Sequence, residues 1–489
     1  MKTIFILMDS LNRHYLPVYG NNWVIAPNIQ RLADRGVVFD NHYCASMPCM
    51  PARRDLLNGR YNFLQAPWGP MEPFDEKLPV ELRRQCDTYS HMTTDHYHYW
   101  EWFGLGYHTP YDTWEFLRGQ EGDHWHPQVQ PPDMPAYRGK NRRQDWINRQ
   151  FMDLQRDEDY PTPQCFAQAM EFLDRNHDAD NWMLHLEVFD PHEPFLTPNH
   201  YRELYDDVWT GDYLIDWPPY APLDPEADTP EAIAHIQKQY AATLTRADAW
   251  LGRLIDRMDK YGMWEDTTVI LTTDHGHLLG DHGYWAKNYM FDYQELVHIP
   301  LIVAGAGVPA GERRTGLTST IDLMPTILEL HGGQPSEHVQ GRSIRPLLTR
   351  DGEHHDAVLY GYFAKDVSFT DGRYTYTRQP QEGSTVDHHT AMAVHATIER
   401  HAELWANAEC GKFLPQANMP VYRIPLPSRR HHNAPDAADL VYDIQADPHQ
   451  QTPLTDEPLR ARLETTLTEL LHRYNAPPCQ YNRTGLHHP

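Results

Sequence analysis

The chain has 489 residues, of which 40% are apolar, and a formal net charge of −26. This length exceeds one ordinary hydrophobic core, so we expect two domains or one large domain with an appendage. The negative charge argues against non-specific binding to nucleic acid or to anionic membranes. Mean hydropathy is −0.69, and because no run of about 18 apolar residues occurs, no membrane span is predicted.

The first predicted element is a strand, because Ile4 to Met8 form an apolar run that ends at Asp9. The run is too short for a secretion signal and lacks a small-residue cleavage site. The six cysteines have no paired spacing, which favours free thiols in a reducing compartment. These observations predict a cytoplasmic protein.

Strands and helices then alternate along the chain. Helices are expected at 28–35, directly after Cys49 and at 231–261, and strands at 181–189, 266–273 and 300–304. The alternation predicts an α/β fold with a large, mostly parallel mixed sheet flanked by helices.

A boundary near residue 350 divides the predicted domains into 1–350, which carries the catalytic residues, and 351–489, which completes the pocket. The second part is expected to be a smaller α+β domain, with strands at 357–363 and 373–378 and a helix at 458–474. Two polar stretches, 119–163 and 205–230, exceed ordinary loop lengths, so we expect them to shape a pocket or to pack as subdomains.

Polar side chains follow several of the predicted strands. Asp9, His192, Asp274 and His275 each come directly after or close behind an apolar run. In open α/β sheets ligands gather at the carboxyl ends of strands, so these residues predict one site. Carboxylates bind hard divalent cations, and an imidazole ligand also admits softer ones.

The most informative motif is Cys-Met-Pro-Ala-Arg at 49–53, a C-x-P-x-R pattern followed by Leu57-Asn58-Gly59-Arg60. It resembles the signature of the formylglycine-dependent (type I) sulfatases of the alkaline phosphatase superfamily. Further segments resemble landmarks of that family in the family's order, namely Asp9-Ser10-Leu11, Asp274-His275-Gly276, 321–326 and 440–448. The resemblance therefore spans most of the chain.

The resemblance implies that a maturation enzyme converts Cys49 to formylglycine. One hydroxyl of the hydrated aldehyde would attack sulfur, and the second would then collapse to the aldehyde and release sulfate. Arg53 would hold the diol. Asp9, Asp274, His275 and the modified Cys49 would bind one divalent ion, with calcium as the first expectation and manganese or zinc as alternatives.

Two positions depart from the family pattern. Many sulfatases have a second aspartate, a metal ligand, where this chain has Ser10. A hydroxyl is a weaker metal ligand, so Ser10 stays a candidate ligand of the same ion beside Asp9, Cys49, Asp274 and His275. The family's Lys-x-His corresponds here to His96-Tyr97-His98, so His96 would replace the lysine and His98 would be the histidine. By the same resemblance, His192 would donate to an ester oxygen and Lys287 would contact the bridging oxygen.

The predicted function is hydrolysis of a sulfate monoester, which makes the protein a sulfuric ester hydrolase. The alternative is a phosphonate monoester or phosphodiester hydrolase with the same aldehyde nucleophile, which Ser10 and Asp274-His275 resemble. An alternative of another class is an inactive binding protein on the sulfatase scaffold. The substrate is expected to be a small sugar, aryl or alkyl sulfate; the sequence identifies neither its alcohol nor whether the chain forms a homo-oligomer.

Overall fold

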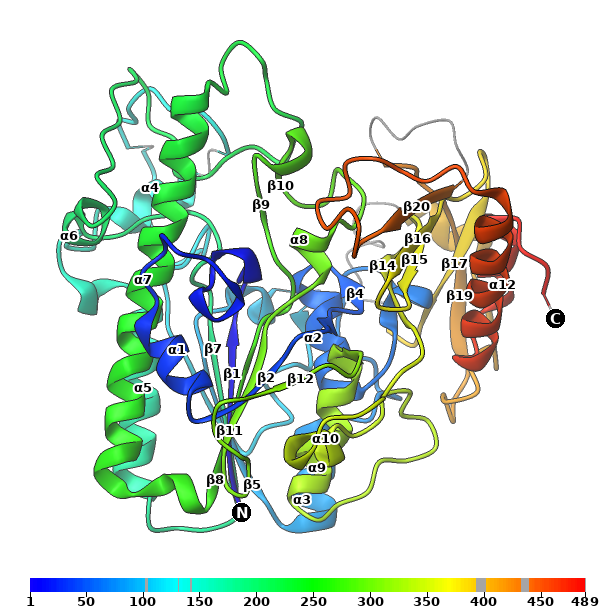
Figure 1. The fold of residues 1–489 in the computed structure, drawn as a ribbon, viewed down its shortest axis with the longest axis horizontal. Coiled ribbons are helices and arrows are strands. Elements are labelled where there is room, and N and C mark those ends of the chain that lie inside the picture. Colours follow the sequence, from blue (N-terminus) through cyan, green and yellow to red (C-terminus); the bar gives the residue numbers. More distant parts are fainter. Residues whose placement is uncertain (102–103, 131, 141–142, 393–401, 432–438, 489) are drawn as a thin grey trace.

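The computed structural model describes the chain except for residues 102–103, 131, 141–142, 393–401, 432–438 and 489. Its centre is an eight-stranded sheet with the order β12-β2-β11-β8-β1-β7-β5-β6 (Figure 1). The strands are β1 (Lys2–Met8), β2 (Gly36–Phe39), β5 (Tyr89–Thr94), β6 (Thr113–Phe116), β7 (Trp182–Val188), β8 (Thr267–Thr272), β11 (Leu301–Gly305) and β12 (Glu312–Arg314).

Most neighbouring strands of this sheet run parallel. The first strand, β1, lies between β7 and β8 and is parallel to both, and β5 continues the parallel arrangement with β7 and β6. The exception is β11, which is antiparallel to β8 and to β2. The predicted mostly parallel, mixed sheet is therefore confirmed.

Helices cover both faces of the sheet (Figure 1). Along β1, Ile4, Ile6 and Met8 join one buried core, whereas Phe5 and Leu7 join another, because successive strand side chains point to opposite faces. The first core contains side chains of α1 (Pro27–Ala33), α5 (Pro161–Asn176) and α7 (Pro230–Tyr261). The second contains side chains of α2 (Cys49–Asn58), α3 (Leu78–Cys86), α9 (Leu323–Leu330) and α10 (Arg345–Thr349).

A second sheet of five strands has the order β20-β16-β15-β14-β4. Four of its strands come from the C-terminal part: β14 (Val358–Tyr362), β15 (Val367–Thr370), β16 (Tyr374–Arg378) and β20 (Asp439–Asp443). The fifth, β4 (Ser46–Met47), comes from the segment just before Cys49 and pairs in parallel with β14. The C-terminal sheet thus directly holds the segment that leads into α2, and the division at residue 350 stays a prediction.

The C-terminal part also contains helices and a small third sheet. α12 (Glu457–Arg473) contributes Leu463 and Leu467 to a core that it shares with β15 and β16. α13 (Pro478–Thr484) follows, and the third sheet consists of β17 (Thr385–Thr390), β18 (Glu409–Gly411) and β19 (Val421–Pro427). The smaller α+β arrangement expected after residue 350 is therefore present.

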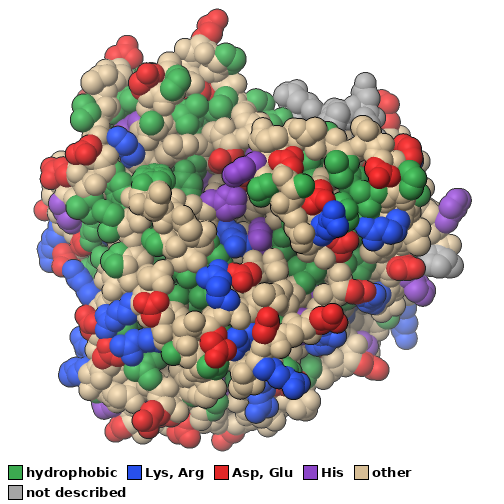
Figure 2. All heavy atoms as spheres, in the orientation of Figure 1, with side chains coloured by type: hydrophobic (Ala, Val, Ile, Leu, Met, Phe, Trp, Pro, Cys, Tyr) green, Lys and Arg blue, Asp and Glu red, His purple; other side chains and the backbone are tan. Residues whose placement is uncertain are grey.

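The remaining short elements are β3 (His42–Tyr43), α4 (Arg143–Arg149), α6 (Asn199–Glu203), β9 (Leu278–Leu279), β10 (Trp285–Ala286), α8 (Gln294–Val297) and β13 (Thr318–Ser319). Of the stretch 119–163, residues 131 and 141–142 lie outside the described part of the chain. Within the described part, every helix is too short or too polar to span a bilayer. Acidic side chains are scattered over the face drawn in Figure 2, whereas several histidines gather near its centre.

Candidate active site

Cys49 is the first residue of α2 and is buried, with 4% of its surface exposed. Its Sγ lies 3.2 Å from His275 Nε2 and 3.5 Å from Lys287 Nζ. The start of a helix offers unpaired N–H groups and the positive end of the helix dipole. The side chain therefore faces one imidazole, one ammonium group and a helix terminus that favours negative charge.

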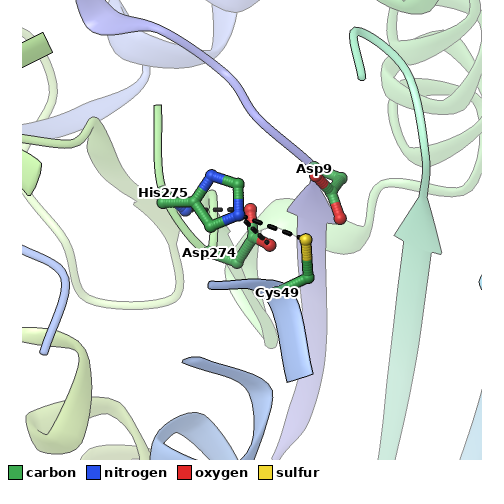
Figure 3. Close-up of side chains that lie close together, drawn as sticks. All are labelled: Asp9, Cys49, Asp274 and His275. Carbon is green, nitrogen blue, oxygen red and sulfur yellow. Dashed lines mark hydrogen bonds and ion pairs between the residues drawn. The ribbon is translucent and has the colours of Figure 1, made fainter. Parts of the chain in front are cut away.

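Asp9 and Asp274 reach Cys49 from the carboxyl ends of two neighbouring parallel strands. Asp9 follows β1, and Asp274 and His275 follow β8 after one intervening residue. One ligand atom from each of Asp9, Cys49, Asp274 and His275 lies within 4.8 Å of the others (Figure 3). Of the strand-end residues that the sequence indicated, Asp9, Asp274 and His275 lie together in this group, whereas His192 lies outside it.

Arg53 lies one helical turn after Cys49 and bonds to three buried carboxylates. Its guanidinium donates to Glu187 Oε1 at 2.6 Å, Asp274 Oδ2 at 2.5 Å and Asp9 Oδ2 at 2.7 Å. Burial alone would lower the pKa of Arg53, but these carboxylates raise it above its ordinary value. Arg53 is therefore a permanent positive charge that fixes the two aspartates, and it also donates to the Cys49 carbonyl oxygen at 3.2 Å.

Lys287 directly follows β10 and reaches the same group of side chains. Its Nζ donates to Ser10 Oγ at 3.0 Å, and this hydroxyl donates to Asp9 Oδ1 at 2.8 Å. Burial lowers the pKa of Lys287, but the charges of Cys49 and Asp9 outweigh it and raise the pKa above its ordinary value. Ser10 therefore connects the lysine to the aspartate, and its backbone N–H donates to Asp274 Oδ1 at 3.1 Å.

Two of the predicted histidines, His98 and His192, lie near the same glutamate, Glu121. His98 Nδ1 is 2.6 Å from Glu101 Oε2, and its Nε2 is 3.8 Å from Glu121 Oε2. His192 Nδ1 is 3.7 Å from Glu121 Oε1 and 2.6 Å from the Glu193 carbonyl oxygen. Glu121 thus lies between the two imidazoles, and it comes from the long stretch 119–163.

His96 is fully buried among aromatic rings, 5.0 Å from the Phe189 ring and 5.2 Å from the His98 ring. Neither of its ring nitrogens has a hydrogen-bond partner among the described residues. Burial, with the nearby charge of Arg53, lowers the pKa of His96 well below its ordinary value. At neutral pH this histidine does not supply the positive charge of the lysine that it replaces.

Sequence reasoning gave no role to four residues that border the site: Glu187, Glu193, Tyr220 and Glu121. Tyr220 donates to Glu193 Oε1, and His277 Nδ1 lies 3.5 Å from Glu193 Oε2. Burial raises the pKa of Glu193, but His192, His277 and Lys287 together lower it below its ordinary value. A charged residue in the mostly apolar strand β7 was the available signal for Glu187, whereas Tyr220 and Glu121 come from the long polar stretches.

The four clustered residues have the donor atoms that a divalent cation needs. Cys49 Sγ stands in for the oxygen that an aldehyde hydrate would present. His275 Nδ1 lies 2.8 Å from the Gly276 carbonyl oxygen, so Nδ1 carries the proton and the lone pair of Nε2 faces Cys49. Burial lowers the pKa of His275 from 6.5 to about 4, which keeps that lone pair free. Two carboxylates and this nitrogen fit a cation.

Comparison with known proteins agrees with this arrangement. The family model described as Sulfatase matches residues 2–333, and the chain therefore belongs to the sulfatase family. It is 25% identical over 415 residues to a choline-sulfatase of Rhizobium meliloti (strain 1021). The aligned region covers 76% of this chain and 77% of that relative.

Two solved structures resemble the whole chain in fold. One is a phosphonate monoester hydrolase of Agrobacterium radiobacter, with a TM-score of 0.68 and 17% identity over 97% of this chain and 95% of that one. The other is a protein in complex with its substrate D-glucosamine-2-N,6-O-disulfate, with a TM-score of 0.67 and 16% identity over 98% and 99% of the two chains.

Proposed function

We propose that this sulfatase-family hydrolase cleaves a sulfate monoester, with formylglycine derived from Cys49 as the nucleophile. The observation that carries the proposal is the position of Cys49 Sγ, 3.2 Å from His275 Nε2 and 3.5 Å from Lys287 Nζ, in one buried group with Asp9 and Asp274. A maturation enzyme would have to oxidise Cys49 to formylglycine. We further propose that the protein is cytoplasmic.

Asp9, Asp274, His275 and the modified Cys49 would hold one divalent cation. When bound, such a cation stabilises negative charge on the nucleophile and on the ester oxygens. Calcium suits the carboxylates, whereas the imidazole of His275 also suits manganese or zinc. Because the hydroxyl of Ser10 already donates to Asp9 and accepts from Lys287, we assign Ser10 to the positioning of these two groups.

The other side chains bind and orient the ester. Lys287 contacts the bridging oxygen, where negative charge develops as the bond to sulfur breaks. His192 donates to a non-bridging oxygen, and His98 donates the proton that the leaving alcohol needs, with its ring oriented by Glu101. Arg53 acts through Asp9 and Asp274, because its N–H groups already bond to these carboxylates and to Glu187.

The second candidate is hydrolysis of phosphonate monoesters or phosphodiesters by the same nucleophile. Ser10 in place of a second aspartate and the Asp274-His275 pair favour it, because at these positions the sequence resembles those hydrolases. The solved phosphonate monoester hydrolase shares the fold. Sulfate monoesters, phosphonate monoesters and phosphodiesters all carry one negative charge, so charge alone does not separate the two candidates.

The test compares kcat/KM for an aryl sulfate, an aryl phosphonate monoester and an aryl phosphodiester on matured, metal-replete protein. We expect the sulfate to exceed the other two by about 10-fold or more, the size of a moderate specificity difference. A higher kcat/KM for the phosphonate monoester or the phosphodiester than for the sulfate would instead support the second candidate. Choline sulfate and sulfated glucosamine, the substrates in the names of the similar proteins, are then the first natural esters to screen.

A paired variant separates the nucleophile from a general effect of losing a buried cysteine. Cys49→Ala should lower kcat/KM by about 10⁴-fold or more, because no covalent step remains. Cys44→Ala is the matched control, since Cys44 is also buried and its Sγ contacts Met47 Sδ at 3.5 Å, in the segment preceding Cys49. No turnover of any of the three esters, with Cys49 unmodified after co-expression with a maturation enzyme, would instead indicate a binding protein.

A further inference from the structure

A second group of metal-binding side chains lies among the described residues, separate from the group around Cys49. Asp322 ends the 3-10 turn η9 (Thr320–Asp322), which leads into α9. His354 and His355 lie in the segment between α10 and β14. One ligand atom from each of these three residues lies within 4.8 Å of the others.

The two neighbouring histidines converge on one carboxylate. His355 Nε2 lies 2.9 Å from Asp322 Oδ1 and 3.0 Å from Oδ2, and His354 Nε2 lies 3.4 Å from Oδ2. Consecutive side chains of an extended segment normally point to opposite sides, whereas these rings are 4.5 Å apart at 73°. The Arg342 carbonyl oxygen, 3.1 Å from His354 Nε2, adds a further oxygen beside the same point.

The carboxylate at the centre of this group is fully buried. Backbone N–H groups of Ser319 and Arg342 donate to its two oxygens at 2.8 Å each. In the described part of the chain, no lysine or arginine side chain forms an ion pair with it, so its charge is available to a bound cation.

Solvent reaches the two histidines through surface cavities. A cavity of about 630 Å³ and another of about 470 Å³ are both lined by His354, His355 and Arg342. The histidine side chains are nevertheless only 6% and 7% exposed. Both histidines thus line accessible cavities although their side chains are largely buried, so a hydrated cation that enters a cavity can exchange its water for protein ligands.

We propose that Asp322, His354 and His355 bind a second divalent transition-metal ion, best fitted by zinc. Two imidazole nitrogens and one carboxylate oxygen are a ligand set that zinc favours over calcium or magnesium. Each histidine binds the ion as a neutral imidazole through the Nε2 lone pair, with its single ring proton on Nδ1; a ring that carries its proton on Nε2 releases it to solvent and takes one up on Nδ1. The Arg342 carbonyl oxygen or water completes the coordination.

The ion would act as a structural clamp at the junction between the two predicted domains. Asp322 accepts from Arg342 N–H, and the neighbouring Gln340 and Gly341 donate to the carbonyl oxygen of Gly59 at 2.9 and 3.0 Å. Gly59 directly follows α2, the helix that begins with Cys49, and caps its C-terminal end. The clamp would therefore tie the segment before β14 to η9 and to the end of α2, without entering the reaction.

The experiment counts zinc bound by the full-length, metal-replete protein after equilibration with added Zn²⁺, and measures Tm with and without a chelator. The double variant His354→Gln/His355→Gln removes both imidazoles but keeps amide donors for Asp322. His338→Gln is the matched control, because His338 lines one of the same cavities without approaching Asp322. Asp274→Ala is a second control, because it removes a proposed ligand from the Cys49 group and leaves Asp322, His354 and His355 unchanged.

We expect the parent protein and the variants His338→Gln and Asp274→Ala each to bind a zinc ion that the double variant lacks. That ion should raise Tm by roughly 2–5 °C. In chelator, the double variant should melt within roughly 2 °C of the parent, since hydrogen bonds to Asp322 persist. Equal zinc content and equal Tm responses in the parent and the double variant would overturn the proposal. Should the double variant fail to fold, His354→Gln alone must lose the same ion.

Discussion

The Cys49 region and the Asp322 region both bring carboxylate and imidazole atoms within 4.8 Å of one another, but they differ in fixed positive charge. Around Cys49, Arg53 bonds to both aspartates and Lys287 lies 3.5 Å from the sulfur. Among the described residues, the Asp322 carboxylate contacts only histidines and backbone N–H groups. Carboxylate and imidazole atoms alone suit a cation, whereas the fixed positive charges beside Cys49 also suit an anionic ligand.

The two regions also differ in how the fold builds them. The Cys49 group stands at the carboxyl ends of β1 and β8 and at the start of α2, where parallel strands and a helix terminus fix each side chain. The Asp322 group joins a short turn to a segment without regular structure. We therefore expect changes in the first region to affect the rate, and changes in the second to affect stability.

The largest effect that separates the regions should come from Asp274→Ala. Loss of this carboxylate removes a cation ligand and a partner of Arg53, so kcat/KM should fall by about 10³-fold or more together with the metal content of the Cys49 site. The double variant His354→Gln/His355→Gln should keep kcat/KM near that of the parent. Parallel elemental analysis and kinetics check both, and unchanged metal content in Asp274→Ala would contradict the ligand assignment.

A smaller effect is expected from the lysine that distinguishes the reaction site. Lys287→Met should lower kcat/KM by about 10²-fold, mainly through kcat, because the ammonium group stabilises charge that develops on the bridging oxygen. Lys2→Met is the matched control: Lys2 is also buried, but it lies at the other end of β1 and pairs with Asp266 at 2.9 Å. Equal losses of activity in both variants would show that Lys287 acts through stability alone.

The smallest effect concerns a histidine buried behind the reaction site. His185 lies on β7, two residues before Glu187, and burial lowers its pKa from 6.5 to about 3. The unfolded chain binds this proton near pH 6.5 and the folded chain only near pH 3. The stability that depends on a neutral His185 is thus complete above pH 6.5 and is lost as the pH falls from about 6.5 to about 3.

Chemical denaturation between pH 7 and pH 4 checks this dependence. His185→Gln should reduce the slope of unfolding free energy against pH by up to about 1.4 kcal/mol per pH unit. Tyr111→Phe removes the hydroxyl that lies 2.6 Å from His185 Nδ1 but keeps the imidazole, so its slope should match the parent. An unchanged slope in His185→Gln would contradict the buried, neutral state.

The parts of the fold with strong local patterns could be predicted from the sequence. β1 and β8 are apolar runs that stop at polar residues, so Asp9 and Asp274 were expected at one edge of the sheet, and the C-x-P-x-R motif pointed to Cys49. The pairing of β4 with β14 could not be predicted, because a strand of two residues has no periodicity and its partner lies some three hundred residues further along the chain.

Other parts of the site depend on the path of long loops. Glu121 and Tyr220 come from the polar stretches, whose conformation is set by packing against the rest of the molecule rather than by local preference. The sequence predicted that Arg53 holds the diol, but it did not indicate the three carboxylates to which its N–H groups bond, because one of them, Glu187, lies on β7, far along the chain. The convergence of Asp322 with His354 and His355 likewise has no sequence motif.

The most direct test of the central claim is peptide mass spectrometry of Cys49 after co-expression with a formylglycine-generating enzyme. The account predicts that the peptide containing residue 49 carries an aldehyde, reacts with a hydrazide probe, and does so in proportion to the activity of the preparation. Full esterase activity in protein whose residue 49 is entirely an unmodified thiol would contradict it.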